Sequence, residues 1–524
     1  MMRGDKDKVE KGGINYTSKT CGRHGTRSSY PQLDARTREA GRQREPCTPP
    51  GPKLLLVFIF LTSMAIVSHA SSLRYINRYN FTTKQASTTS SSPSSAQGSR
   101  DSRPSLALVR RDEVTGSTYP SLRHAVLDLV ARDNARAEYL ATRLSPAYQP
   151  PGFSGSESKV VSGLDEGSGE YLVRVSVGSP PTEQYLVVDS GSDVMWVQCK
   201  PCLECYVQAD PLFDPATSAT FSGVSCGSAI CRILPTSACG DGELGGCEYE
   251  VSYADGSYTK GALALETLTL GGTAVEGVVI GCGHRNRGLF VGAAGLMGLG
   301  WGPMSLVGQL GGEVGGAFSY CLASRGGYGS GAADDDAGWL VLGRSEAVPE
   351  GAVWVPLVRN PRAPSFYYVG LSGIEVGDER LPLQAGLFQL TEDGAGDVVM
   401  DTGTTVTRLP QEAYAALRDA FVGALAGAVP RAQGVSSSVL DTCYDLSGYA
   451  SVRVPTVSFC FDGDARLILA ARNVLLEVDM GIYCLAFAPS SSGLSIMGNT
   501  QQAGIQITVD SANGYIGFGP ANCG

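Results

Sequence analysis

Two segments of this chain repeat one another 212 positions apart. Residues 187–192 read VVDSGS, and residues 399–404 read VMDTGT. About 100 residues after each copy, two apolar residues and a glycine follow, as LMG at 296–298 and IMG at 496–498. A single Asp-Ser-Gly is a common turn. Two copies that end apolar runs, each with the same downstream partner, predict a duplicated architecture in which the two aspartates meet.

A pair of carboxylates, Asp189 and Asp401, suits the hydrolysis of peptide bonds. A hydrolase must activate water and also protonate the leaving amine. Two carboxylates at hydrogen-bonding distance do not both ionise easily, so the pair shares a proton and titrates jointly. The ionised member can accept a proton from a bridging water while the protonated member polarises the substrate carbonyl. We therefore predict that these two aspartates are the catalytic residues.

The residues around each aspartate have predicted supporting roles. Glycines let the backbone approach closely and turn. The first hydroxyl residue of each motif can tie the two loops together beneath the pair, and the second can donate a hydrogen bond to the outer carboxylate oxygen. These residues are Gly191 and Gly403 for the close approach, Ser190 and Thr402 for the tie, and Ser192 and Thr404 for the outer oxygens.

From Gly169 onward the sequence has the pattern of an all-β protein. Short runs rich in Val, Leu and Ile, such as YLVRVSV and GIQITVD, are separated by Gly, Pro, Asp and Ser, and only residues 411–425 look clearly helical. Together with the repeat, this pattern predicts two β-rich lobes, residues 169–347 and 348–524. The lobes would face each other across a cleft to which each contributes one aspartate.

The cysteines and the net charge limit the kinds of site that residues 161–524 can form. Thirteen of the 15 cysteines lie between Cys199 and Cys523, and His284 is the only histidine after residue 160. A disulfide framework in an oxidising compartment is therefore a better interpretation than zinc sites. Residues 161–524 carry a net charge of −21, which repels phosphate backbones and argues against nucleic-acid binding.

The beginning of the chain has the features of a targeting region. Residues 1–53 form a polar, basic leader, either an upstream extension or part of a plastid address. Residues 54–70 hold the apolar run LLLVFIFLTSMAIV followed by SHA, which predicts a signal peptide, with a signal anchor as the alternative. We therefore expect a secreted or vacuolar protein that uses the secretory pathway, and the chloroplast is the alternative.

Residues 71–160 are expected to be a pro-segment. A Ser/Thr-rich linker occupies 85–105, and residues 120–145 place apolar side chains at helical spacing with arginines between them. A basic amphipathic helix ahead of an acidic body predicts a segment that docks on the body and inhibits it. The alternative is a solvated linker helix that never touches the active site.

Over residues 169–524 the chain resembles the pepsin-like aspartic proteases, and more closely the plant nepenthesin-like branch with its guard-cell subgroup. The resemblance is carried by long stretches such as DSGSDVMWVQCKPCLECY, GCGHRNRGLFVGAAGL and MDTGTTVTRLP. It implies an aspartic endopeptidase that is made as a zymogen and works at acidic pH. Polypeptide substrates would bind extended in the cleft, and neither cofactor nor metal is expected. We also expect a monomer.

The resemblance further assigns a flap and a set of disulfides. Tyr253 would close over the substrate, and Trp196 would bond this tyrosine. Asp255, Gly256 and Ser257 would complete the flap, and Ala254 departs from the glycine usual in this branch. A Cys-rich insertion spans 199–247. The implied pairs are Cys199–Cys202, Cys205–Cys282, Cys226–Cys247, Cys231–Cys239, Cys321–Cys523 and Cys443–Cys484, which leaves Cys460 as a buried free thiol.

Other interpretations fit the sequence less well. Some plant relatives of this fold are inhibitors or binding proteins that lost a catalytic residue, but both motifs are intact here. A plastid nucleoid protease that binds DNA would need the basic leader for that contact. The glycines around Gly281 lack the lysine of a phosphate loop, and no Gly-x-Ser-x-Gly elbow accompanies His284 as a serine-protease triad would require. A calcium site at residues 334–336 is the alternative to a solvated loop.

Overall fold

The computed structural model describes residues 73–77, 103–143 and 171–523, apart from gaps at 235, 240–245, 254–256, 289, 291, 325–336, 345–348, 393, 435–438, 491 and 522. All described residues belong to the second of two compact units of the chain, Ser63–Gly524. Among them, no helix is long and apolar enough to cross a membrane. The expected signal peptide and the triple aspartate at 334–336 lie outside the described residues.

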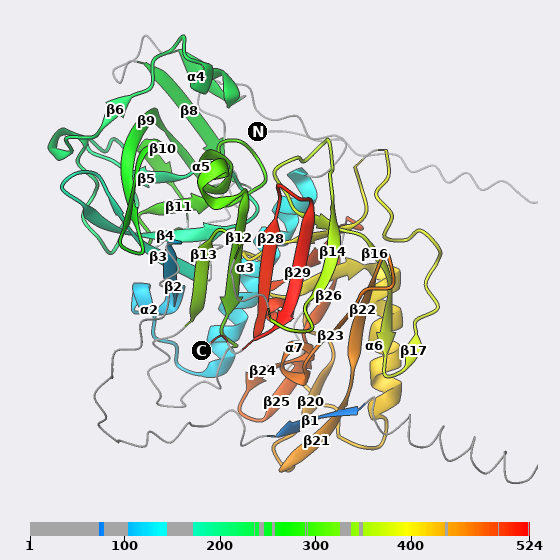
Figure 1. Cartoon of the computed structure of the whole chain (residues 1–524). Coiled ribbons are helices and arrows are strands. Elements are labelled where there is room, and N and C mark those ends of the chain that lie inside the picture. The colour runs from blue at the N-terminus through cyan, green and yellow to red at the C-terminus, as the bar shows by residue number, and fades with distance from the viewer. Residues whose placement is uncertain are drawn as a thin grey trace, which may run out of the picture. The chain divides into compact units, whose positions relative to one another are not determined.

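The fold is mostly β, as the sequence pattern predicts (Figure 1). The elements up to the aspartate of the first repeated motif are β1 (Leu73–Asn77), β2 (Ser105–Arg110), α2 (Arg111–Thr115), α3 (Leu122–Arg143), β3 (Tyr171–Val177) and β4 (Thr182–Asp189). Between the motifs lie β5 (Trp196–Gln198), η1 (Pro215–Thr217), β6 (Ser222–Gly223), α4 (Ala229–Ile233), β7 (Ser237–Cys239), β8 (Cys247–Ser252), β9 (Tyr258–Leu270), β10 (Thr273–Arg287), β11 (Gly295–Gly298), α5 (Leu306–Val314), β12 (Ala317–Leu322), β13 (Gly338–Leu342), β14 (Val353–Val358), β15 (Tyr368–Val369), β16 (Leu371–Val376), β17 (Glu379–Arg380) and β18 (Val398–Met400).

The elements after the second motif are β19 (Thr407–Pro410), α6 (Gln411–Leu425), β20 (Cys443–Asp445), β21 (Ser451–Pro455), β22 (Val457–Phe461), β23 (Arg466–Ile468), α7 (Ala471–Val474), β24 (Leu475–Asp479), β25 (Ile482–Leu485), β26 (Phe487–Ser490), β27 (Ser495–Met497), α8 (Asn499–Gln502), β28 (Ile505–Asp510) and β29 (Tyr515–Pro520). Helix α6 covers the predicted residues 411–425. The division into lobes between residues 347 and 348 stays a prediction.

The sequence repeat appears as the same strand pairing in both halves. In the first half, β4 runs parallel to β11, so that Gly298 lies opposite Asp189 in the register. In the second half, β18 runs parallel to β27, and Met400 lies opposite Met497. The two-apolar-plus-glycine segments therefore lie directly beside the strands that lead into the aspartates, which explains why each motif has a downstream partner.

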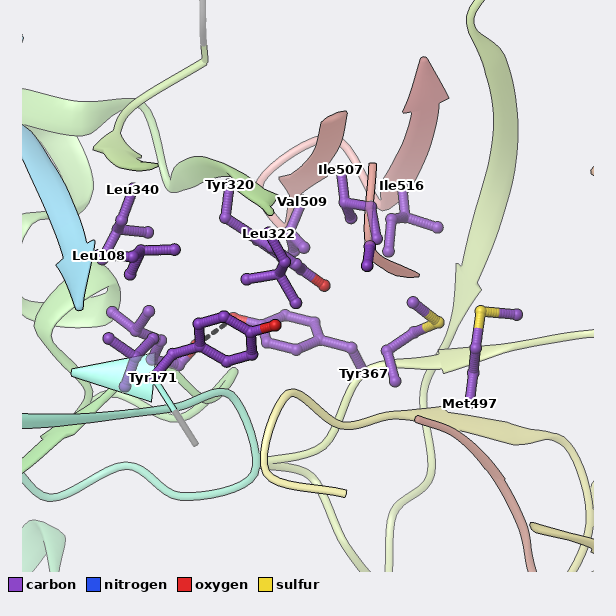
Figure 2. Close-up of a cluster of buried hydrophobic side chains, with 14 of the residues drawn as sticks. Leu108, Tyr171, Tyr320, Leu322, Leu340, Tyr367, Met497, Ile507, Val509 and Ile516 are labelled. Atoms are coloured by element: carbon purple, nitrogen blue, oxygen red, sulfur yellow. Dashed lines mark hydrogen bonds between the residues drawn. The ribbon is translucent and has the colours of Figure 1, made fainter. Parts of the chain in front are cut away.

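A central antiparallel sheet joins the two halves of the chain. Its strand order is β2–β13–β12–β28–β29–β14, and β2 also pairs with β3 of the first half. Strand β2 lies within the expected pro-segment, and its Leu108 is buried in the main core near Tyr171 and Leu340 (Figure 2). The residues of the expected pro-segment therefore contribute a strand and core side chains to the fold rather than lying outside it.

Helix α3 packs its apolar side chains onto the second half of the chain. Val126 and Val130 join a buried cluster that includes Val406. At the other end of the helix, Leu140 is buried in a cluster with Phe366, which also contains Val399 and Ile496 from β18 and β27. The helix predicted over 120–145 thus forms over Leu122–Arg143 and is docked, not solvated.

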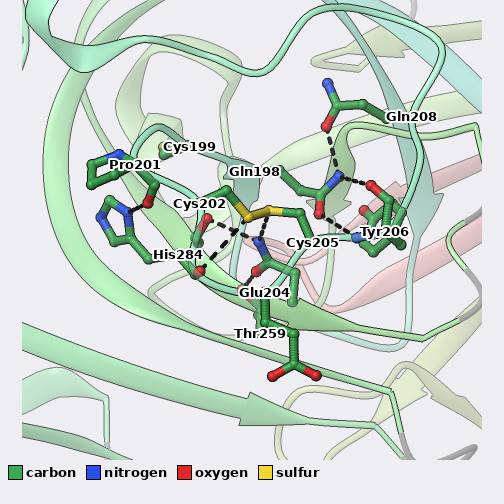
Figure 3. The surroundings of a disulfide bond; sticks show 12 residues. Gln198, Cys199, Pro201, Cys202, Glu204, Cys205, Tyr206, Gln208, Thr259 and His284 are labelled. Atoms are coloured by element: carbon green, nitrogen blue, oxygen red, sulfur yellow. Dashed lines mark hydrogen bonds between the residues drawn. A yellow bond between two sulfur atoms is a disulfide. The ribbon is translucent and has the colours of Figure 1, made fainter.

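The structure contradicts four of the six implied disulfides. Cys199 pairs with Cys282, and Cys202 pairs with Cys205. The cause is the parallel pairing of β5 with β10, in which Cys282 lies opposite Val197 and the amide of Cys199 donates to the carbonyl of Gly283. This register brings Cys199 to Cys282 and leaves the other two cysteines together in the loop shown in Figure 3.

The remaining correction concerns the second part of the Cys-rich insertion. Cys231 pairs with Cys247, and Cys226 pairs with Cys239. Burial explains why these pairs replace the implied Cys226–Cys247 and Cys231–Cys239, because Cys231 and Cys247 are both buried whereas Cys239 is exposed. The expected bridges Cys321–Cys523 and Cys443–Cys484 are present, and Cys460 is a buried free thiol.

Candidate active site

The two aspartates come together at the ends of the repeated strand pairs. Asp189 is the last residue of β4, and Asp401 follows β18 directly. Both side chains are buried. The loops that carry them are joined by Ser190 and Thr402: each amide donates to the hydroxyl of the other residue, at 3.4 Å and 3.2 Å, and the two hydroxyls are 3.3 Å apart. The predicted tie beneath the pair is therefore present.

The glycines and outer hydroxyls have unequal surroundings in the two motifs. The amides of Gly191 and Gly403 donate to the inner oxygens of their own aspartates, at 3.0 Å and 3.3 Å. Thr404 donates its hydroxyl to Oδ2 of Asp401 at 2.6 Å, as predicted. Within the described part of the chain, Ser192 makes no equivalent bond, and Oδ2 of Asp189 accepts none.

A guanidinium from α3 occupies the position between the two carboxylates. Nη2 of Arg136 is 2.8 Å from Oδ1 of Asp189 and 2.8 Å from Oδ1 of Asp401, and Nε is 3.0 Å from Oδ2 of Asp401. The guanidinium also fills the space above the first glycine, where a methyl group added at Gly191 would meet Nη2 at 2.6 Å. The arginine side chain is buried together with both of its partners.

This contact affects the charge state of Asp189. Burial is the largest single effect and acts to raise the pKa of Asp189, but the positive charge of Arg136 and the hydrogen bonds that this carboxylate accepts together outweigh burial and hold the pKa below its ordinary value of 3.8. The arginine therefore favours an ionised carboxylate. Sequence reasoning missed Arg136, since nothing in the pattern distinguishes it from the other arginines of the same helix.

A second ion pair fixes the same helix one turn earlier. Asp133 is fully buried and accepts hydrogen bonds from the amides of Thr405 and Val406 and from the guanidinium of Arg408. Burial raises the pKa of Asp133 above its ordinary value, and Arg408 and the two amides offset only part of that effect. These residues were not predicted as part of the site.

The flap residues that the structure describes match the resemblance. The indole of Trp196 donates to the hydroxyl of Tyr253 at 2.8 Å, and Phe290 packs edge-on against both rings. The carbonyl of Ser257 accepts the amide of Tyr253 at 2.7 Å, which closes the base of the hairpin. The expected flap positions Asp255 and Gly256, and Ala254, lie outside the described residues.

Other chemistry finds little support in the described ranges. They hold no group of three His, Cys, Asp or Glu side chains that could bind a metal ion. His284 lies on β10 beside the loop of Figure 3, where its Nδ1 is 2.9 Å from the carbonyl oxygen of Pro201 and burial lowers its pKa. The imidazole of His284 thus contacts a backbone carbonyl oxygen, which is not a nucleophile that a histidine could activate.

A duplicated strand pair that brings two buried aspartates together defines the class of pepsin-like aspartic proteases, which are aspartic-type endopeptidases. Comparisons with known proteins agree. The family models Xylanase inhibitor N-terminal and Xylanase inhibitor C-terminal match residues 171–344 and 366–520. The chain is 57% identical over 428 residues to Protein ASPARTIC PROTEASE IN GUARD CELL 2 of Arabidopsis thaliana, covering 80% of this chain and 88% of that protein.

A second relative is Aspartic proteinase nepenthesin-2 of Nepenthes gracilis, 39% identical over 76% of this chain and 86% of its own length. The chain belongs to the pepsin-like aspartic proteases, within their plant nepenthesin-like branch. Solved structures share the fold at low identity. The crystal structure of edgp has a TM-score of 0.56 at 18% identity and covers 71% of this chain and 96% of its own, and that of Basic 7S globulin from soybean has 0.54 at 17%, over 67% and 93%.

Proposed function

We propose that this chain is the zymogen of an aspartic endopeptidase of the secretory pathway, in which residues 71–160 block the dyad until acid releases them. The observation that carries this proposal is the position of Arg136, which bonds Asp189 and Asp401 at once. A substrate carbonyl and a bridging water need the space that this guanidinium fills. We further propose a monomer that is secreted or vacuolar.

In the released enzyme the two carboxylates would share one proton. Without a cation between them they do not both ionise easily, so one member is available to accept a proton and the other to donate one. The ionised member takes a proton from the bridging water, which attacks the substrate carbonyl, and the protonated member polarises that carbonyl. The proton then passes to the leaving amine. Thr404 supports this chemistry because it orients the Asp401 carboxylate.

The features of the pro-segment favour an inhibitor over a passive linker. Val126, Val130 and Leu140 anchor α3 in two buried clusters, and Asp133 and Arg136 satisfy buried charges of the body. A passive linker would need none of these contacts. Because β2 also forms part of two sheets, the segment should be tested in the folded precursor rather than by deleting it before folding.

The test compares two arginines of the same helix. Arg136→Met removes the guanidinium from the dyad, whereas Arg123→Met makes the same change at a side chain that, in the described part of the chain, bonds the exposed carbonyl of Gly434. Purified precursors are acidified, and cleavage of a denatured protein and the new N-terminus are followed with time. We expect a lag in the wild type and in Arg123→Met, and a shorter lag in Arg136→Met. A wild-type precursor that is fully active at once would refute the zymogen.

A further inference from the structure

A carboxylate beside the first repeated motif bonds to both halves of the chain. Asp193 lies four residues after Asp189, in the loop between β4 and β5. Its Oδ1 accepts the amide of Gly302 at 3.0 Å, and its Oδ2 accepts the hydroxyl of Ser365 at 2.5 Å. Gly302 belongs to the loop after β11 in the first half, whereas Ser365 lies in the second half, between β14 and β15. Asp193 therefore links the two halves within four residues of the dyad.

The loop after β11 is shaped around this carboxylate. A methyl group added at Gly300 or at Gly302 would collide with the oxygens of Asp193, so the glycine on each side of Trp301 makes room for them. The guanidinium of Arg359 lies over the ring of Trp301, with Cζ 3.4 Å from the ring centroid, and its positive charge attracts Asp193. The carboxylate thus has a fitted place rather than a chance contact.

Ser365 continues the link towards the second aspartate. Its carbonyl accepts the amide of Trp301 at 2.7 Å, so its backbone bonds the first half as its hydroxyl does. Two residues further along the chain, the carbonyl of Tyr367 accepts the amide of Met400 at 2.9 Å, directly before the second aspartate. The hydroxyl of Tyr367 donates to the carbonyl of Leu299 at 2.8 Å, again across the halves. A short path of hydrogen bonds and chain therefore joins the two catalytic loops through this serine.

The duplicated architecture does not require this carboxylate. The carbonyl of Ser192 accepts the amide of Gly300 at 2.8 Å, and the carbonyl of Thr404 accepts the amide of Asn499 at 2.7 Å. In each half, then, the chain after the downstream glycine bonds back to the motif through the backbone. The next residue is Asp193 in the first motif but an uncharged threonine in the second. The first motif therefore carries an additional acceptor, and that acceptor reaches across to the second half.

Two points of attachment fix an orientation that one point leaves free. The hydrogen bonds between Ser190 and Thr402 join the two catalytic loops at one point. On their own they leave the two carboxylates free to rock about that point. The bond between Asp193 and Ser365 joins the same halves at a second point. Catalytic groups need such support, because their geometry must be held closely to be productive.

We infer that Asp193 is a positioning residue that, through Ser365, holds the two catalytic aspartates at the separation the reaction needs. It acts through the dyad and takes no part in proton transfer. The inference rests on the proposed function, because it concerns the dyad of the released enzyme. It adds a determinant of the catalytic rate that lies outside the repeated Asp-Ser/Thr-Gly motifs.

The test measures kcat and KM of acid-activated variants with a quenched fluorescent peptide that the wild type cleaves. Asp193→Ala removes both bonds of the carboxylate, and Ser365→Ala removes only the bond between the halves. We expect kcat to fall by about tenfold to a hundredfold in both with little change in KM, since a misplacement of about 1 Å can cost about 10²-fold. Ser365→Thr keeps a hydroxyl and should retain most of the wild-type kcat.

The pH profile of kcat distinguishes positioning from general stabilisation. Two neighbouring carboxylates titrate with two separate apparent pKa values, because each charge disfavours the other. If the carboxylates move apart in the variants, this repulsion weakens and the two limbs of the profile should approach each other. Ser365→Ala keeps the Asp193 carboxylate, so the same shift there cannot come from the loss of that charge. A residue that only stabilises the fold would lower the melting temperature and leave both limbs in place.

Two other ionisable side chains interact with Asp193, and neither titrates in the acidic range. Arg359 stays protonated, as arginines do in proteins. Burial raises the pKa of Tyr367 well above its ordinary value of 10. The acidic limbs therefore report on carboxylates and not on these two groups.

Asp210 provides the matched control. Its Oδ2 accepts the amide of Tyr185 at 2.9 Å and its Oδ1 pairs with Arg174 at 3.1 Å, so it also holds one amide and one side chain, but within the first half. Asp210→Ala should leave kcat and both limbs unchanged. In the double variant Asp193→Ala/Ser365→Ala, kcat should fall no further than in Asp193→Ala, because both changes break the same bond.

The outcomes separate the inference from the proposed function. An active wild type with unchanged kcat and limbs in both single variants, or fully additive losses in the double variant, overturns the positioning role and leaves the protease intact. A wild type that never gains activity on acidification overturns the proposed function, and the inference falls with it. Asp193 and Ser365 are both partly exposed, so water can solvate the groups that a substitution leaves. If Asp193→Ala nevertheless fails to fold, Ser365→Ala and Ser365→Thr decide the question.

Discussion

Ser190 and Thr402 exchange backbone-to-hydroxyl hydrogen bonds in both directions, which locks the two catalytic loops to each other. Thr402→Val keeps the shape of the side chain but leaves the buried amide of Ser190 without its acceptor. We expect a loss of about 1–3 kcal/mol in the free energy of unfolding, measured by denaturant titration, together with reduced kcat. Thr402→Ser should restore both. A Thr402→Val variant as stable and active as the wild type would contradict the role of this pair.

The dyad makes a sharp prediction for amide substitutions. Asp189→Asn and Asp401→Asn are nearly isosteric but remove the group that must exchange a proton. Each should lower the proteolytic rate by about 10²–10⁴-fold or more, since acid–base catalysis contributes on that scale. Circular dichroism should show an unchanged fold. More than about a hundredth of the activity remaining in either variant would exclude the proposed mechanism.

The pH dependence of pro-segment release follows from the sign of two pKa shifts. With α3 docked, burial raises the pKa of Asp189, but the charge of Arg136 and the hydrogen bonds to this carboxylate together hold the pKa below 3.8, so the contact with Arg136 favours the ionised form. The contribution of this pair to docking is therefore present above about pH 4 and lost as pH falls through the lowered pKa.

The pKa shift of Asp133 has the opposite sign to that of Asp189. Burial raises its pKa, so its contribution to docking is present at low pH and lost as pH rises through the raised value. Acid release must therefore act through Arg136 and the dyad. Hydrogen exchange of peptides from residues 122–143 should show protection that falls below about pH 4 in the wild type. Arg136→Met should lack this step. Protection that increases on acidification would contradict acid release through Arg136 and the dyad.

The sequence predicted the repeat-based parts of the molecule well, because repetition reports on topology directly. Two motifs with matching downstream partners required two equivalent strand pairs, and the structure contains them as β4 with β11 and β18 with β27. Helix α6 was recognisable because its apolar residues recur at helical spacing. Helix α5 was not, since its sequence LVGQLGGEV contains three glycines, each unfavourable in a helix. Its Ser305 cap and buried Leu306 and Leu310 stabilise it instead.

The sequence could not predict the contacts that depend on how the folded elements are placed, because that placement decides which side chain reaches the site. Arg123, Arg132 and Arg136 share one helix and one chemistry, and only the docked position of the helix selects the one that meets the dyad. The contacts of Asp133 were invisible for the same reason, because they come from the backbone amides of Thr405 and Val406 and from Arg408, which only the docked helix brings together. The cysteines of the insertion lie a few residues apart, so several pairings satisfy the chain, and burial and strand register decide among them.

The disulfide framework is open to a direct test, because the structure and the family resemblance give different pairings for the same eight cysteines. Digestion of the unreduced protein followed by mass spectrometry should yield peptides that join Cys199 to Cys282 and Cys231 to Cys247.

The Cys231–Cys247 bridge is buried, whereas Cys226–Cys239 includes an exposed cysteine. Removing the buried bridge with paired alanines should therefore destabilise the protein more than removing the exposed one, within about 2–5 kcal/mol for a native disulfide. Peptides joining Cys199 to Cys202, or equal losses from the two double variants, would favour the pairing implied by the resemblance. Alkylation without reduction should label Cys460 only after unfolding, since its thiol is free but buried.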